Sequence, residues 1–131
     1  MTNFRIALLA AVFVLPGAAL AQKHTHDHPT PAAAHGGVVA EATGENWVEL
    51  LIAGDRLTAW VSDEGNKPIA SARLGGKATV LVAGKREEVQ LAPGEANSLS
   101  GKLATAPFGK VTSVLALMID GKPVQVRFAP R

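Results

Sequence analysis

The residues best suited to chemistry in this chain are its four histidines, which all lie in one short segment near the N-terminus. They are His24, His26, His28 and His35, and no other histidine occurs. Imidazole nitrogen is a common ligand for Zn(II), Cu(II) and Ni(II), and most imidazole is neutral and able to bind at near-neutral pH. Alternate histidines with Asp27 among them therefore predict a transition-metal site.

The alternate spacing indicates what kind of metal site this is. In an extended chain every second side chain points the same way, about 7 Å apart, which is too far for two of them to share one ion. A flexible segment has to fold around the ion instead, at roughly 1–2 kcal/mol of conformational entropy per ordered residue. We therefore expect modest affinity and little selectivity among Cu(II), Ni(II) and Zn(II), with no organic cofactor.

Gln22, Lys23 and His24 form a second type of site when Gln22 is the first residue of the mature protein. A free amine, two deprotonated backbone amides and the imidazole of a third-position histidine can surround an ion in a plane. Cu(II) and Ni(II) accept this square-planar nitrogen geometry. The arrangement requires that Gln22 keep a free amine rather than cyclise.

Residues 1–21 have the three parts of a secretory signal peptide. Arg5 supplies the positive charge, residues 6–15 form a short apolar core, and Ala19 and Ala21 are the small residues before the expected cleavage point. The apolar core is shorter than the ~20 residues that cross a bilayer. We expect export to the periplasm, cleavage after Ala21 and a mature protein that is not embedded in a membrane.

The remaining chain divides into an arm at 22–35 and a single β-domain at 36–131. The arm is polar and then rich in Pro and Ala, without apolar periodicity, which predicts a disordered segment. Beyond it, short apolar runs alternate with Gly, Pro, Asn and Asp, as in an all-β domain. The expected strands are 37–43, 46–53, 56–62, 68–73, 77–83, 86–91, 97–104, 111–119 and 123–129.

Apolar residues at every second position predict one buried face for most strands. Residues 114–119 are apolar on both faces, which predicts a central strand with Met118 in the core. Such strands form an antiparallel β-sandwich of immunoglobulin-like type, which we favour, or a small barrel. The buried positions expected from alternation are Leu57, Ala59, Val61, Val80, Val82, Val89, Leu91, Val124, Val126 and Phe128.

Composition argues against several classes of function. The chain has no Cys and no Tyr, and the β-domain has no histidine beyond His35, so the usual nucleophile–base pairs cannot be assembled and we expect no enzyme. Basic and acidic residues are interspersed and the net charge is only +2, which gives no footprint for nucleic acid.

Three residues near the start of the domain have more than one plausible role. His35 is either a metal ligand or a structural residue that begins the first strand. Glu49 is either a metal ligand near His35 or a satisfied carboxylate on an outer face. Trp60 lies opposite the buried face of its strand, so we expect it to be partly exposed.

Five segments of the chain together resemble a known family. They are His35-Gly36-Gly37-Val38-Val39 and residues 48–51, 57–61, 63–69 and 126–128. These segments resemble small exported proteins related to the N-terminal β-domain of periplasmic adaptor subunits from heavy-metal efflux pumps of the cobalt–zinc–cadmium type. The resemblance implies a periplasmic setting, metal handling and an efflux or envelope partner. The chain lacks the coiled hairpin and lipoyl-like regions of those adaptors, which puts a direct efflux role in doubt.

Two functions from different classes follow from these patterns. The first is an exported protein that binds a divalent transition metal through its arm, as a buffer or an accessory to metal efflux. The second is an interaction domain that docks on an envelope partner by a strand edge or by the Trp60 face, without a physiological metal.

Overall fold

The computed structural model describes residues 28–130. The expected leader lies outside this range, as do the arm positions Gln22, Lys23, His24, His26 and Asp27. Within residues 28–130, no helix has the length and apolar character needed to cross a membrane.

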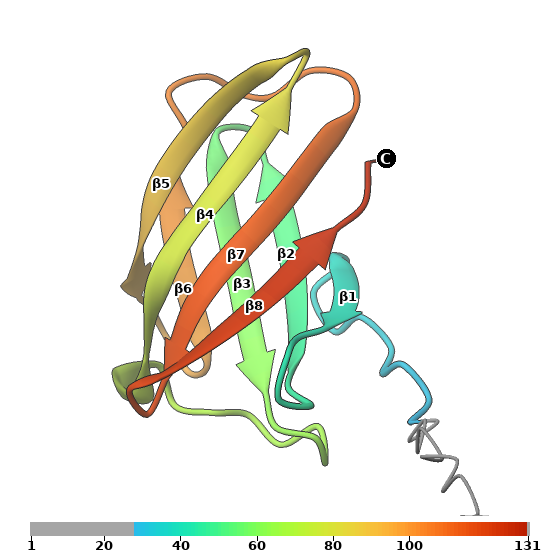
Figure 1. Ribbon diagram of the computed structural model, residues 1–131, viewed down its shortest axis with the longest axis vertical. Helices are drawn as coiled ribbons and strands as arrows, with labels where there is room; N and C mark the ends of the chain where they lie inside the picture. Colours follow the sequence, from blue (N-terminus) through green and yellow to red (C-terminus); the bar gives the residue numbers. More distant parts are fainter. Residues whose placement is uncertain (1–27, 131) are drawn as a thin grey trace, which may run out of the picture.

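The domain is all-β, with eight antiparallel strands in one sheet (Figure 1). In sheet order the strands run β1-β2-β3-β6-β5-β4-β7-β8. Their bounds are β1 (Val38–Glu41), β2 (Trp47–Ala53), β3 (Arg56–Ser62), β4 (Leu74–Val82), β5 (Lys85–Pro93), β6 (Ser98–Lys102), β7 (Val111–Ile119) and β8 (Lys122–Phe128).

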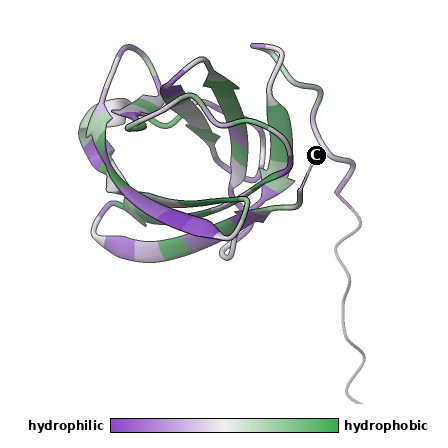
Figure 2. Ribbon diagram, turned by 90° about the horizontal axis from the view of Figure 1, so that it is seen from above, coloured by the Kyte–Doolittle hydropathy of each residue, from purple (hydrophilic) through white to green (hydrophobic). Residues whose placement is uncertain are grey.

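The sheet curls into a nearly closed barrel, which Figure 2 shows as a ring seen from above. Strand β5 joins its two halves, because it pairs with β4 along most of its length and with β6 through Ala92 and Pro93. The ends of the sheet meet where the Thr43 backbone N–H donates to the Gln125 carbonyl at 2.9 Å, and the Gln125 N–H donates to Thr43 Oγ1 at 2.9 Å. Of the two arrangements that alternation left open, the chain adopts the barrel.

The predicted inward face is confirmed. Nine of the ten positions expected from alternation are buried, and Val82 packs partly buried against them. Asp120 and Gly121 form the tight turn between β7 and β8, with φ of 51° and 77° at these two residues, the positive values that a primed turn requires.

Two predictions about strands were wrong. Residues 68–73 do not form a strand, since Pro68 makes only an isolated bridge to Ser62 and a 3₁₀ turn, η1 (Ser71–Arg73), follows. Met118 is 42% exposed rather than in the core. On β7 the inward positions are those of Leu115, Leu117 and Ile119, so Met118 points outward although both faces are apolar.

Candidate functional site

The candidate site begins with Glu49, a carboxylate on the outside of the barrel that is nevertheless only 7% exposed. The inward positions of β2 hold Val48 and Leu50, so Glu49 points to the opposite face. There it lies directly across from Trp60 on β3. The chain preceding β1 passes over this pair and shields the carboxylate from water, as its hydrogen bonds show.

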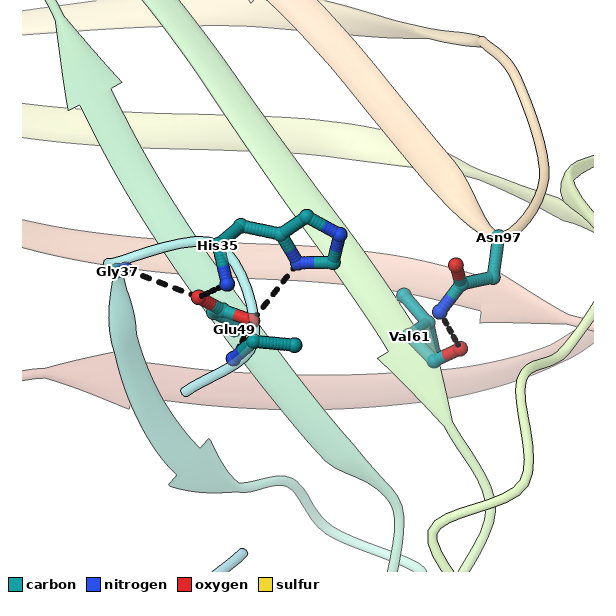
Figure 3. A network of polar contacts seen from close by, with 6 residues as sticks. His35, Gly37, Glu49, Val61 and Asn97 are labelled. Atoms are coloured by element: carbon teal, nitrogen blue, oxygen red, sulfur yellow. Dashed lines mark hydrogen bonds and ion pairs between the residues drawn. The ribbon is translucent and has the colours of Figure 1, made fainter. Parts of the chain in front are cut away.

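Glu49 accepts four hydrogen bonds, all from residues 34–37 (Figure 3). Its Oε1 accepts the backbone N–H groups of His35 at 2.8 Å and Gly37 at 2.9 Å. Its Oε2 accepts the backbone N–H of Ala34 at 3.0 Å and lies 2.9 Å from the ring Nδ1 of His35. Of the two roles considered for Glu49, this is the satisfied carboxylate, because both oxygens are committed to the chain that crosses them.

The electrostatics keep Glu49 anionic. Burial raises the pKa of its carboxyl group, but the hydrogen bonds from His35, Gly37 and Ala34 together outweigh burial and hold the pKa below the ordinary value of 4.5. An ionised carboxylate can only accept hydrogen bonds, so Nδ1 of His35 must carry the proton. In the neutral ring, the lone pair is then on Nε2.

The ring of His35 is held by a second contact, a parallel stack on the indole of Trp60. The ring centroids are 3.9 Å apart and the planes differ by 3°. Glu49 fixes the edge of the imidazole and Trp60 fixes its plane, which leaves the side chain oriented while still 42% exposed. Trp60 is partly exposed, as predicted, and the imidazole covers one of its faces.

The two glycines after His35 explain how the chain reaches this position. Gly36 has φ of +79°, the left-handed conformation that favours glycine. At Gly37 a Cβ atom would lie 2.5 Å from the Leu50 carbonyl oxygen and 2.9 Å from Cγ of Glu49. Each residue of His35-Gly36-Gly37 therefore has a separate role. His35 binds Glu49 through its ring, Gly36 adopts the left-handed conformation, and Gly37 lets the chain approach β2 closely.

A hollow of about 320 Å³ lies beside the imidazole. The arm forms part of its wall through Pro31, Ala32 and Ala34. The remaining lining comes from the barrel and its loops: Val39, Trp47, Glu49, Trp60, Ser62, Asn66, Pro68 and Asn97. Asn97 is held in place by its side-chain N–H, which donates to the Val61 carbonyl at 2.9 Å.

Of the residues predicted to bind metal, the structure describes His28 and His35. His28 is exposed and precedes in sequence the arm residues that line the hollow, whereas His35 is attached to the barrel. Among residues 28–130, no three His, Asp or Glu side chains converge closely enough to hold an ion. Sequence analysis missed the stack on Trp60, since alternation gives the face of a residue but not its partner across the sheet.

No protein family, curated protein or solved structure matches this chain.

Proposed function

We propose that this protein is an exported periplasmic metal-binding protein that captures Cu(II), Ni(II) or Zn(II) through its N-terminal arm. The ligands are His24, His26 and His28, with Asp27 as an oxygen donor. Gln22 and Lys23 supply the amine and amide nitrogens of a planar site when cleavage follows Ala21. The barrel serves as the scaffold that carries this arm, and the protein acts as a metal buffer or as an accessory to efflux.

The observation that carries this proposal is the fixed root of the arm. Ala34, His35 and Gly37 are all bound by Glu49, so the C-terminal end of the arm is attached at a defined point on the barrel surface. Histidines at every second position of one short segment are at a high local concentration for one another, which favours capture of an ion by several of them at once.

Calorimetric titration with Cu(II), Ni(II) and Zn(II) tests the proposal. The proteins to compare are the chain from Gln22 onward and a variant in which His24, His26 and His28 are all alanine. We expect binding in the first and a loss of at least tenfold in affinity in the second. A visible absorption band of planar nitrogen ligation with Cu(II), absent in His24→Ala, would identify the amine-terminal site. Equal binding by both proteins would refute the proposal.

A second candidate, docking on an envelope partner, is favoured by an open strand edge. Strand β1 pairs with β2 only as far as Leu50, so within the described chain Leu51, Ile52 and Ala53 have no β1 partner. Beside them lies a hollow of about 380 Å³ that includes Phe128 and Pro107. An added strand from a partner could pair with such an edge. Unchanged partner capture after removal of all arm histidines would support this reading.

A further inference from the structure

The hollow beside the open edge of β2 is a feature that the proposed metal site does not use. We propose that this hollow, at one mouth of the barrel, binds a small uncharged apolar molecule that carries one hydrogen-bonding group. Its lining lies within residues 36–129 and includes none of the histidines, so the inference goes beyond the proposed function and does not depend on it.

The hollow exists because β1 is shorter than its neighbour. Strand β1 pairs with β2 only between Trp47 and Leu50. Before Val38 the chain turns away from the sheet and binds Glu49 on the outside of the barrel. Beyond Leu50, the seam between β2 and the end of β8 is therefore left open, and a hollow of about 380 Å³ lies there.

Inward-facing side chains from three strands form the walls of the hollow. Ile52 of β2, Val111 of β7 and Phe128 of β8 all line it, and each falls on the inward alternation of its strand. Ile52 and Val111 pack partly buried against the core, and Pro107 of the β6–β7 loop adds a further apolar wall. Such walls are typical of small-molecule pockets, which are mostly apolar with a few polar groups that orient the ligand.

Ser113 supplies the polar group of this hollow. It occupies an inward position of β7, is only 2% exposed, and its hydroxyl makes none of the side-chain hydrogen bonds of the described chain. No polar side-chain atom in residues 28–130 is fully buried without a partner, so Oγ must still be accessible, and the hollow that Ser113 lines gives that access. Buried polar groups almost always have a partner, and a hydroxyl can donate or accept. The partner that we assign to this hydroxyl is a polar atom of the ligand.

The lining also defines the class of ligand. None of the described residues that line the hollow carries a charge, and Ser113 is the one with a polar side chain. Burying an ion without a counter-charge is costly, so the hollow favours an uncharged molecule. An engineered apolar cavity of about 150 Å³ binds benzene. The present hollow of about 380 Å³ is more than twice as large, which gives room for a molecule of two fused rings.

A docked strand would account for less of this geometry. Such a strand would pair with the main chain of Leu51, Ile52 and Ala53 at the edge of β2. Ser113 lies on β7, which is already paired with β4 and β8 on its two sides, so main-chain pairing at β2 leaves its hydroxyl without a partner. A small molecule in the hollow can contact the apolar walls and this hydroxyl at once.

A matched set of naphthalene derivatives tests the inference. The probes are 2-naphthol, 2-methylnaphthalene and 2-naphthoate, which differ only in carrying a hydroxyl, a methyl or a carboxylate group. Each is titrated into the chain from Gln22 onward and followed by amide ¹H–¹⁵N shifts. We expect 2-naphthol and 2-methylnaphthalene to shift the amides of Ile52, Val111 and Phe128. We expect 2-naphthoate to bind at least about 10-fold more weakly, because its charge has no counter-charge in the hollow.

Two substitutions in the walls separate shape from hydrogen bonding. Ser113→Ala should weaken 2-naphthol roughly 3- to 10-fold, the contribution of one neutral hydrogen bond, and should leave 2-methylnaphthalene unchanged. Ile52→Trp places an indole in the hollow and should abolish binding of both probes. Met118→Trp is the matched control, because it adds the same side chain at an exposed position of β7 outside the hollow and should leave both affinities unchanged. Urea unfolding shows whether each variant is folded.

The outcomes that overturn the inference are distinct. Absence of shifts at Ile52, Val111 and Phe128 in the native protein would overturn it, whichever variants fold. Equal affinities of Ser113→Ala and the native protein for 2-naphthol would overturn the role of the hydroxyl. If neither probe binds but Ile52→Trp abolishes partner capture, the hollow holds a docked strand and the inference is overturned. None of these results bears on the metal titrations, so the proposed function stands or fails separately.

Discussion

The carboxylate of Glu49 and residue His35 are joined at two points, through the backbone N–H at 2.8 Å and through ring Nδ1 at 2.9 Å. The two residues are 14 positions apart in sequence, and this double contact fixes both the path of the chain and the orientation of the ring. A single outward-facing residue of β2 therefore determines how the arm leaves the barrel.

We predict that Glu49→Ala destabilises the domain by about 2–4 kcal/mol, because the N–H groups of Ala34, His35 and Gly37 lose a charged acceptor and a hydrogen bond to a charged group contributes about 1.5–3 kcal/mol. Urea unfolding measures the free energy, and amide hydrogen exchange at these three residues measures release of the chain. Glu41→Ala, at an exposed position of β1, is the matched control and should cost less than about 0.5 kcal/mol. Equal effects of the two substitutions would contradict the assigned role of Glu49.

The lowered pKa of Glu49 predicts a specific dependence of stability on acid. A carboxyl group whose pKa is lower in the folded state contributes stability above its unfolded value, and that contribution is lost as the pH falls through the folded value. The free energy of unfolding should therefore decrease as the pH falls below the ordinary value of 4.5. Glu49→Gln should remove part of this decrease. A variant with the same acid profile as the native protein would show that other carboxyl groups cause it.

Much of the barrel could be predicted from the sequence because alternation is a local property. Leu57, Ala59 and Val61 share a face whatever lies beside them, and Asp120-Gly121 makes a tight turn through its own backbone. The prediction of buried residues failed where the pattern allowed either face of a strand to point inward. Met118 sits in a strand that is apolar on both sides, so periodicity could not tell which side faces inward.

The candidate site was harder to predict, because it depends on register between distant segments. Alternation placed Glu49 and Trp60 on outer faces, but only the pairing of β2 with β3 makes them neighbours. The sequence also assigned His35 to the arm, whereas its backbone and ring are bound to β2. The adjacent pair Gly36-Gly37 was the one local indication that the chain crosses the barrel closely here.

Gly37→Ala should weaken the contacts of Glu49 without touching Glu49 itself. A methyl group 2.5 Å from the Leu50 carbonyl oxygen pushes the chain away from β2, at a cost of about 1–3 kcal/mol. Because the same contacts are then already disturbed, Glu49→Ala should cost less in this background than in the native protein. Gly75→Ala is the control, since a Cβ at Gly75 would meet nothing within 4 Å. Additive effects of Gly37→Ala and Glu49→Ala would disprove the coupling.

Gly75 and Gly76 provide a sharp test of how β4 packs beside β7. A Cβ at Gly76 would lie 2.3 Å from the Ala116 carbonyl oxygen, and its φ is +143°. At Gly75 a Cβ would meet nothing within 4 Å. Gly76→Ala must therefore push two paired central strands apart, and we expect it to cost at least about 2 kcal/mol of unfolding free energy. Gly75→Ala should be neutral or slightly stabilising, because alanine restricts the unfolded chain more than glycine does. Urea unfolding of the two variants measures this asymmetry between adjacent glycines. Gly76 permits the close approach of β4 to β7 at this point, and equal costs for the two variants would show that the strands are not in such contact.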